Sequence, residues 1–557
     1  MVVAERDTLT MRKAVGTLND FEKSAVPSEL KGTRGIGHTR WATHGGVSEK
    51  NAHPHLSCDG RIAVVHNGII ENYLSIRSAL SRKGHLFSSG TDSEVIVHLI
   101  EDELKGKATL KDAVLSAISM LRGSYGLLIT EAGTNTLIAV KNESPLILGI
   151  DQNKLFAASD PVPILKYTSR VVYLNDGELA ILSPKRFECF TFDGQGIGKT
   201  VSQIDWKAES SEKGDYEHFM LKEIEEQPQA IKHASMQDEE DVVAFANEIK
   251  NAKGVILVAN GTALHAGLAG QYLFDRIARK HVNVVNASEF PYLQTSLSDG
   301  SLVIAISQSG ETADVLNALK LARAKGARIF SIVNVVGSSI ERMSERVLYL
   351  RVGPEIAVAS TKAFMGQLAI LYLLAQTLNG EVRKGLQDLR TLSHWIRETI
   401  ETNHERVKVL AKVLSERQDV YFIGRAINYP LALEGALKMK EISYIHAEGM
   451  PAGELKHGTL ALVEKRTPIL LLNAGKESRE ASIGNAMETK ARGAWVIGVS
   501  EEHHESYDEW LELPKASNRV SPLLAVIPLQ LLAYYCAVYR GINPDRPRNL
   551  AKSVTVK

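Results

Sequence analysis

Three hydroxyl side chains and a glycine follow an apolar run near the middle of the chain. The run Leu302–Ile306 predicts a buried strand. Directly after it, and before a helical pattern begins, come Ser307, Ser309, Gly310 and Thr312. The free N–H groups and the dipole at a helix start favour an anion, and a glycine lets the backbone approach it closely. One hydroxyl would indicate an ordinary helix cap, whereas three around a glycine favour a phosphate-binding loop.

A second group of reactive side chains lies on a predicted helix, Leu433–Ile442. Glu434, Lys438 and Glu441 share one face of it, because they are spaced i, i+4 and i+7. They could form a solvated stripe of ion pairs. The other residues are mostly apolar, however, so we expect a buried helix whose charges have partners or a catalytic task. His457 follows in a glycine-bounded loop and is a candidate proton carrier.

Two polar stretches near the N-terminus carry further side chains suited to binding. Residues 39–45, Thr-Arg-Trp-Ala-Thr-His-Gly, are dense in hydrogen-bond donors. Residues 66–68, His-Asn-Gly, directly follow a predicted strand at Ile62–Val65. On the local pattern alone, Asn67–Gly68 is best interpreted as a hairpin turn.

The elements that must position these groups change in character along the chain. Residues 1–205 predict an α+β domain, because short apolar strands alternate irregularly with amphipathic helices. Its predicted strands are 62–65, 127–129, 136–140 and 171–174, and its predicted helices are 72–83, 93–104 and 110–121. Residues 206–241 are polar and are interrupted by Pro228. They predict an interdomain linker with a helix at 217–226.

Residues 242–557 alternate short apolar strands with helices, as in a parallel sheet covered on both faces. The pattern restarts, and Ser307–Thr312 corresponds in position to Asn473–Ser478. We therefore expect an α/β fold with two doubly wound parallel-sheet modules, at 242–395 and 396–540, and a C-terminal tail at 541–557. Only the first module has the full set of hydroxyls, so one ligand per chain is expected.

The composition excludes several classes of partner. The 557 residues carry 65 Lys plus Arg and 65 Asp plus Glu, which gives no electrostatic case for nucleic acid or a membrane surface. The widely separated Cys58, Cys189 and Cys536 indicate a reducing compartment such as the cytoplasm, and argue against disulfides or a zinc framework, so no metal is expected. The most apolar run, Leu523–Tyr539, contains Pro528 and is too short for a membrane span, which predicts a buried helix.

Several motifs, in this order, resemble the glutamine–fructose-6-phosphate aminotransferases, a family also called glucosamine-6-phosphate synthases. The resemblance covers nearly the whole chain. Its motifs are residues 38–45, 65–72, 307–312, 358–364, 433–438, 454–458 and 550–556. It implies an N-terminal glutaminase of the nucleophile-hydrolase type, two sugar-isomerase modules, a homodimer or larger assembly, and no cofactor.

The resemblance also implies a role for each candidate residue of the isomerase part. Lys552, in the tail, would form a Schiff base with the open-chain ketose. Glu441 would move a proton between C1 and C2, and His457 would open the sugar ring from the neighbouring subunit. Glu434 and Lys438 would complete the polar site. The implied sugar-phosphate residues are Thr262, Ser307, Gln308, Ser309, Thr312, Glu355 and Ser360.

In the glutaminase part the resemblance implies a second site. Arg40 and Asp92 would clamp the glutamine, and Asn67 and Gly68 would form the oxyanion hole. The lining and gate of the ammonia path would be Trp41, Thr43 and His44.

The sequence departs from the family pattern in two places. The family nucleophile is an N-terminal cysteine that opens a Cys-Gly-Ile stretch, which this sequence lacks. We therefore expect its start to lie inside the family pattern, without the first strand and helix, and expect a gap in the amidase core. The second departure is Ala263, where the family often has a serine, so one hydroxyl is lost from the phosphate site.

The resemblance predicts glucosamine 6-phosphate synthesis from fructose 6-phosphate and an amine. The amine is glutamine-derived in the family, and we expect free ammonia for this chain without its cysteine. Two other functions stay open, namely a deglycase that removes the amine from a sugar 6-phosphate and a non-catalytic sugar-phosphate sensor. Deglycases generally lack the amidase part, and the retention of Glu441, His457 and Lys552 argues against a sensor.

Overall fold

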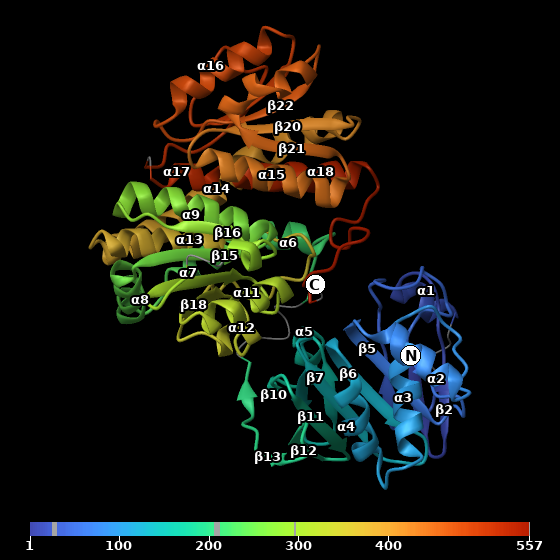
Figure 1. Ribbon diagram of the computed structural model, residues 1–557. Coiled ribbons are helices and arrows are strands. Elements are labelled where there is room, and N and C mark those ends of the chain that lie inside the picture. The colour runs from blue at the N-terminus through green and yellow to red at the C-terminus, as the bar shows by residue number, and fades with distance from the viewer. Residues whose placement is uncertain (25–29, 205–211, 294–296, 518, 556–557) are drawn as a thin grey trace. The chain divides into compact units, whose positions relative to one another are not determined.

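The computed structural model describes residues 1–24, 30–204, 212–293, 297–517 and 519–555 (Figure 1). The chain divides into two compact units. The first is Met1–Ala208 with Val554–Lys557, and the second is Glu209–Ser553. Residues 206–211 of the expected linker and residues 556–557 of the expected tail lie outside the described part.

A seven-stranded antiparallel sheet forms the centre of the first unit, in the order β13-β12-β11-β7-β6-β5-β4. Its strands are β4 (His55–Leu56), β5 (Ile62–Ile70), β6 (Gly123–Glu131), β7 (Leu137–Asn142), β11 (Glu178–Ser183), β12 (Arg186–Thr191) and β13 (Gly196–Ile197). Side chains alternate between the two faces of a strand, and Ile62 and Val64 of β5 pack against a helical layer. That layer is α2 (Tyr73–Arg82), α3 (Glu94–Leu104) and α4 (Leu110–Met120).

A second layer of strands covers the opposite face of this sheet, toward which Ala63 and Val65 point. It consists of two separate sheets, ordered β2-β1-β3 and β14-β10-β8-β9. Their strands are β1 (Val2–Glu5), β2 (Thr8–Met11), β3 (Arg34–Ile36), β8 (Ile147–Ile150), β9 (Leu155–Ala158), β10 (Arg170–Tyr173) and β14 (Ser202–Gln203). The unit also contains the short helices α1 (Leu18–Ser24) and α5 (Val162–Leu165). A helix–sheet–sheet sandwich is the α+β arrangement that the sequence predicts here.

The hairpin turn expected at Asn67–Gly68 is wrong, because both residues lie inside β5, opposite Gly126 and Tyr125 of β6. Gly68 has a φ of +140°, and a Cβ there would lie 2.0 Å from the Ser124 carbonyl oxygen. This glycine therefore marks a close approach of two backbones inside a strand. The local turn pattern is overridden by pairing along a nine-residue strand, which a short window of sequence does not contain.

Two five-stranded parallel sheets form the second unit, ordered β16-β15-β17-β18-β19 and β21-β20-β22-β23-β24. The first contains β15 (Gly254–Ala259), β16 (Asn283–Asn286), β17 (Ser301–Ser307), β18 (Arg328–Val333) and β19 (Arg346–Tyr349). The second contains β20 (Asp419–Gly424), β21 (His446–Pro451), β22 (Pro468–Leu472), β23 (Trp495–Ser500) and β24 (Glu509–Glu512). Both sheets have the same order when their strands are numbered from the start of each module. The predicted α/β fold class with two doubly wound modules is confirmed.

Long helices lie between these two sheets and share one continuous apolar core (Figure 1). They are α9 (Gly261–Ala278), α13 (Lys362–Leu378), α14 (Val382–Leu414), α15 (Asn428–Ser443) and α18 (Val526–Tyr539). The outer face of the first sheet is covered by α10 (Phe290–Leu293), α11 (Ala313–Ala324) and α12 (Ser339–Arg342). The outer face of the second is covered by α16 (Arg479–Lys490) and the 3-10 turns η4 (Ala452–His457) and η5 (Thr459–Leu462). Each sheet is therefore covered on both faces, as its apolar strands require.

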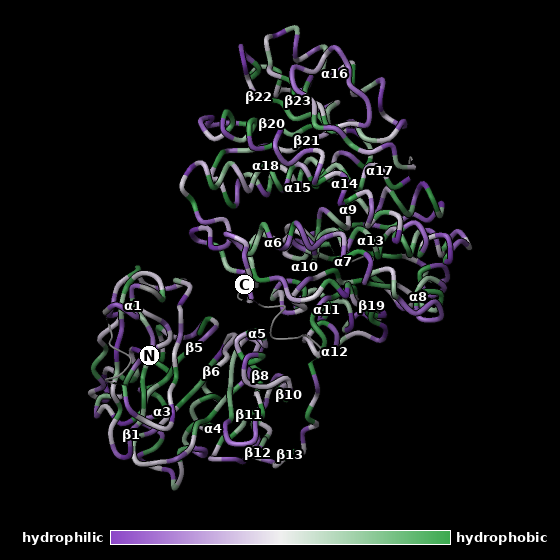
Figure 2. The backbone as a smooth tube through the Cα atoms, turned by 180° about the vertical axis from the view of Figure 1, so that it is seen from behind, coloured by the Kyte–Doolittle hydropathy of each residue, from purple (hydrophilic) through white to green (hydrophobic). Residues whose placement is uncertain are grey.

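The most apolar segment comprises α17 (Ser521–Leu524) and α18 (Figure 2). Ser521–Tyr539 is the one segment of the described chain that is long and apolar enough to cross a membrane. Because 94% of this apolar stretch is buried inside the protein, it is a core helix. The predicted buried helix at Leu523–Tyr539 is confirmed.

The described part of the expected linker is largely helical. The helix predicted at 217–226 corresponds to α6 (Phe219–Glu225), and α7 (Gln227–Ala234) and α8 (Glu239–Asn251) follow it. These helices pack against α13, α14 and α18 of the second unit. Pro228 lies in the first turn of α7, where a helix needs no backbone donor, so it begins a helix.

Candidate functional site

The predicted phosphate-binding loop lies at the carboxyl ends of β15 and β17. These strands are neighbours, and the chain leaves them in opposite directions, from β15 to β16 and from β17 to β18. Doubly wound sheets bind ligands at such a switch point. Thr262, in the first turn of α9, follows β15, and Ser307 ends β17. The two segments therefore lie at the expected ligand position.

The hydroxyl groups of this loop are gathered at the start of α11. The Ser307 hydroxyl accepts a hydrogen bond from the Gly310 N–H at 3.0 Å, and the Ser309 hydroxyl accepts one from the Glu311 N–H at 3.2 Å. Thr312 is the N-cap residue, yet its side chain forms no capping hydrogen bond and lies 3.3 Å from the Ser307 hydroxyl. The arrangement is therefore a cluster of donors rather than a simple helix cap.

The backbone path of the loop requires a glycine. Gly310 has a φ of +67°, and a Cβ there would lie 2.1 Å from Ser338 Oγ. Among the described residues, the buried hydroxyls of Ser338 and Ser360 have no hydrogen-bond partner. A buried hydroxyl without a partner is unfavourable, so these groups favour a ligand or water in the loop. The remaining predicted loop residue, Gln308, lies between Ser307 and Ser309 in the chain and is half-buried.

In the second module, the corresponding loop Asn473–Ser478 already interacts with a carboxylate of the protein, that of Glu501. Glu501, which follows β23, accepts a hydrogen bond from the Gly475 N–H at 2.7 Å and pairs with Arg479 at 2.9 Å. It also accepts a hydrogen bond from the Ser521 hydroxyl. An internal carboxylate thus takes a backbone donor that an external anion would use, which favours the first module as the ligand site.

Glu434, Lys438 and Glu441 form a buried charge cluster on α15 with Thr262. Lys438 Nζ donates to Glu441 Oε2 at 2.6 Å and to Thr262 Oγ1 at 3.0 Å, and lies 3.4 Å from Glu434 Oε1. The side chains of Glu434 and Lys438 are 0% and 1% exposed, which excludes a solvated stripe. Burial alone would lower the pKa of Lys438, but the two carboxylates outweigh it and raise this pKa. Lys438 is therefore a fixed positive charge.

The C-terminal tail brings Lys552 to the phosphate loop. Its Nζ pairs with Glu355 Oε2 at 2.5 Å, and the hydroxyl of the next residue, Ser553, donates to Ser309 Oγ at 3.1 Å. Burial would raise the pKa of Glu355, but Lys552 and hydrogen bonds from two backbone N–H groups outweigh it and lower this pKa. The tail lysine is held beside the loop by a buried, ionised carboxylate.

His457 is not joined to this cluster within the chain. It lies at the end of η4, and its side chain is exposed. Among the described residues, no hydrogen bond or ion pair connects it to Glu441 or Lys552.

In the first unit, the residues implied to bind glutamine are also brought together. The Arg40 guanidinium donates to the carbonyl oxygens of His44 at 2.6 Å and Gly45 at 2.8 Å. Buried Asp92 accepts a hydrogen bond from the Ile70 N–H of β5 at 2.8 Å, and its carboxylate lies 3.9 Å from His44 Nδ1. The neighbouring candidates are the exposed Trp41 and Thr43 of the same loop and the half-buried Asn67 and Gly68 of β5.

Two residues near the isomerase site were not predicted from the sequence. His265 Nδ1 lies 2.8 Å from Glu434 Oε2, and its position one helical turn after Thr262 could have indicated it. Buried Glu223 accepts a hydrogen bond from the Ala357 N–H at 3.2 Å. Burial and the neighbouring charge of Glu355 raise the Glu223 pKa. No local pattern marks Glu223, because its partners lie far along the chain.

Comparison with known proteins gives two matching domain families. A model for the SIS domain matches residues 248–377 and again 413–540, and a model for a glutamine amidotransferase domain matches residues 38–166. A glutamine–fructose-6-phosphate aminotransferase (isomerizing) of Thermococcus kodakarensis is 46% identical over 569 residues, covering 100% of this chain and 94% of the relative. One of Methanothermobacter thermautotrophicus is 43% identical over 555 residues, covering 99% and 93%.

Solved structures match the second unit. The C-terminal domain of glucosamine-fructose-6-phosphate aminotransferase from Francisella tularensis aligns with a TM-score of 0.56 and 35% identity, covering 60% of this chain and 100% of that one. A glucosamine-6-phosphate deaminase from Thermotoga maritima aligns with a TM-score of 0.50 and 25% identity, covering 61% of this chain and 100% of that one.

Proposed function

This chain belongs to the glutamine–fructose-6-phosphate aminotransferase family, and from that membership we propose that it makes glucosamine 6-phosphate from fructose 6-phosphate and an amine. The observation that carries the proposal is the position of Lys552, whose amine lies at Glu355 while Ser553 contacts the phosphate loop. The amidotransferase match in the first unit favours synthesis over the deglycase alternative. Detection of glucosamine 6-phosphate by mass spectrometry, after incubation with fructose 6-phosphate and ammonium, tests the proposal.

We propose a separate task for each group. The loop at Ser309 holds the 6-phosphate, and Lys552 attacks the C2 carbonyl, releasing water as the Schiff base forms. Glu441 moves the proton between C1 and C2, because its side chain is 21% exposed whereas that of Glu434 is fully buried. Lys438, permanently charged, neutralises both carboxylates without competing as the nucleophile.

For the amine, we propose that the 557-residue polypeptide uses free ammonia. Cys189 and Cys536 are buried in β12 and α18, and burial raises the pKa of both thiols, which makes them poor nucleophiles. Cys58 contacts His85 and His98 instead of the Arg40 and Asp92 region. Within the described part of the chain, no hydrogen bond joins any of the three thiols to the proposed glutamine-binding groups.

Replacing Ser309 with alanine should weaken fructose 6-phosphate binding about tenfold or more, because a hydrogen bond to a charged group is worth roughly 1.5–3 kcal/mol. The matched control is Ser478→Ala, which removes a hydroxyl from the second-module loop and should leave affinity unchanged. Calorimetric titration with fructose 6-phosphate measures both. Equal affinities for wild type and Ser309→Ala would remove this loop from the phosphate site.

Ala263→Ser should tighten the binding of fructose 6-phosphate, because it would restore to the proposed phosphate site the hydroxyl that the family often has at this position.

We also propose a homodimer or larger assembly in which His457 serves the neighbouring subunit, because its exposed side chain is unconnected to its own chain's cluster. Mixing inactive His457→Ala with inactive Lys552→Ala protein should then recover about a quarter of wild-type activity, since half of randomly exchanged dimers gain one complete site. The assay is ammonium-dependent product formation. Absence of recovery, with subunit exchange verified by native mass spectrometry, would place both residues in one chain.

We propose the domain limits 1–205, 206–241, 242–395, 396–540 and 541–557, since each module match lies within one of them. We also propose a cytoplasmic location, because all three cysteines are free thiols.

A further inference from the structure

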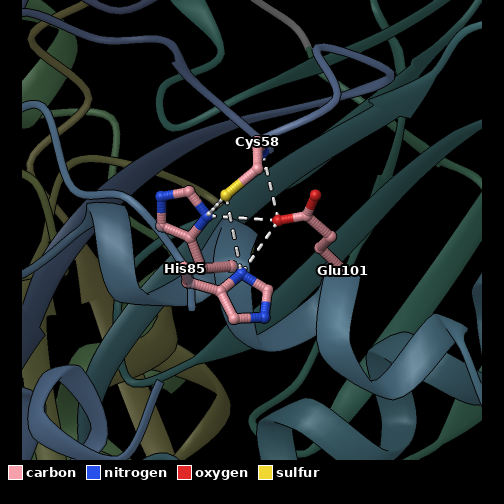
Figure 3. A group of neighbouring side chains, drawn as sticks. Cys58, His85 and Glu101 are labelled. Carbon is pink, nitrogen blue, oxygen red and sulfur yellow. Dashed lines mark hydrogen bonds and ion pairs between the residues drawn. The ribbon is translucent and has the colours of Figure 1, made fainter. Parts of the chain in front are cut away.

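A group of four potential metal ligands lies in the first unit, outside the residues assigned above (Figure 3). Cys58 lies in the connection between β4 and β5, and His85 lies in the loop after α2. His98 and Glu101 are one turn apart on α3. One ligand atom from each of the four lies within 4.8 Å of every other.

Four of the distances within the group are close to those of a zinc site. Cys58 Sγ lies 3.7 Å from His85 Nδ1 and 3.5 Å from His98 Nδ1. Glu101 Oε2 lies 3.0 Å and 3.2 Å from the same two nitrogens. Zinc bond lengths of about 2.3 Å to sulfur and about 2.0–2.2 Å to nitrogen and oxygen give tetrahedral edges of about 3.3–3.6 Å. The four separations are close to these edges, so the four atoms are near enough together to bind one ion.

The outer nitrogens of both rings face carboxylates. His85 Nε2 lies 3.4 Å from Asp102 Oδ1, and His98 Nε2 lies 3.8 Å from Glu94 Oε1. A metal ion bound at the two Nδ1 atoms would leave each ring proton on Nε2, where His85 has Asp102 within hydrogen-bond distance and His98 has the charge of Glu94 nearby. Glu101 Oε2 thus lies within 3.2 Å of Nδ1 of both rings, so the three atoms converge on one place.

Backbone N–H groups also contact the sulfur of Cys58 and the carboxylate of Glu101. The Leu86 N–H points at Cys58 Sγ from 3.5 Å, and the Cys58 N–H donates to Glu101 Oε2 at 3.1 Å. The side chains of His85 and His98 are each only 2% exposed, whereas Cys58 is exposed. The two histidine ligands are therefore buried, and an ion could enter the group from solvent at the exposed Cys58.

We propose that Cys58, His85, His98 and Glu101 bind one zinc ion. A thiolate, two imidazoles and a carboxylate are ligand types that suit zinc, and four protein ligands leave no open position for catalysis. The ion would be structural. It would tie the β4–β5 connection to α3. That connection leads into β5, which contains Asn67 and Gly68, and Asp92 lies just before the start of α3. The proposed ion therefore braces the predicted glutamine-binding groups of the amidotransferase unit.

The sequence did not indicate this site because three of its ligands lie far apart in sequence. Only His98 and Glu101 are close in the chain, and a His-x-x-Glu pair on a helix is common without a metal. Folding of the β4–β5 connection and the loop after α2 onto α3 brings in Cys58 and His85.

The test uses untagged, full-length protein purified without chelator. Elemental analysis should find about one zinc per chain, and replacing the zinc with cobalt(II) should give a tetrahedral spectrum with a thiolate-to-cobalt charge-transfer band. Cys58→Ser should lose that band and most of the zinc, while the matched control Cys189→Ala should keep both. Added zinc should also raise the Tm of metal-free wild type but not of Cys58→Ser.

Three results would overturn the proposal. One is wild-type protein without stoichiometric zinc after reconstitution. Another is a cobalt spectrum without the charge-transfer band, which would indicate adventitious binding by histidines alone. The third is zinc retained equally by Cys58→Ser and Cys189→Ala. Because the first two results come from the wild-type protein, the proposal stays testable even if Cys58→Ser fails to fold.

Discussion

Replacing Lys552 with arginine should lower the rate of glucosamine 6-phosphate formation by about a thousandfold or more, because a guanidinium does not form a Schiff base. Arginine keeps the positive charge that pairs with Glu355, so the loss reports nucleophilic chemistry rather than the broken ion pair. The rate is measured with fructose 6-phosphate and saturating ammonium. The matched control is Lys440→Arg, at an exposed position of α15, which should leave the rate unchanged.

A direct test of the covalent step accompanies this variant. Borohydride reduction in the presence of fructose 6-phosphate should attach the sugar to Lys552, as peptide mass mapping would show. The Lys552→Arg protein should give no adduct, although it should still bind the sugar through Ser309 and the rest of the phosphate loop. An adduct on another lysine, or an active Lys552→Arg enzyme, would assign the nucleophile to a different residue.

With the 557-residue polypeptide, the glutamine-dependent rate should lie about a thousandfold below the ammonium-dependent rate at equal fructose 6-phosphate. Hydrolysis of an amide by this kind of site needs a thiolate, and binding groups alone leave only residual catalysis. The buried thiols of Cys189 and Cys536 cannot replace it, because burial raises their pKa. The isomerase unit, in contrast, retains its loop, its carboxylates and its lysine.

The comparison requires protein whose N-terminus has been confirmed by mass. Asp92→Asn is the control for the ammonium reaction, which it should leave unchanged, because Asp92 lies in the first unit. A glutamine-dependent rate comparable to the ammonium rate, lost in Asp92→Asn, would show a nucleophile that the present assignment does not contain.

The sequence by itself determined much of the secondary structure and the repeated architecture of this protein. Apolar runs, helical periodicity and the hydroxyl cluster after β17 are local signals, and each is complete within one short stretch. The doubly wound modules and the hydroxyl cluster at the start of α11 could therefore be predicted, as could the shared face of Glu434, Lys438 and Glu441 on α15.

Only the tertiary structure decided which distant groups meet. Lys552 and Glu355 are separated by 197 positions, and their contact depends on where the tail lies. Asn67 and Gly68 have a turn sequence but are held in β5 by pairing with β6. The four proposed zinc ligands, Cys58 included, come from the β4–β5 connection, the loop after α2 and α3. In each case the free energy of the contact comes from partners that no short window of sequence contains, so local propensity could not indicate it.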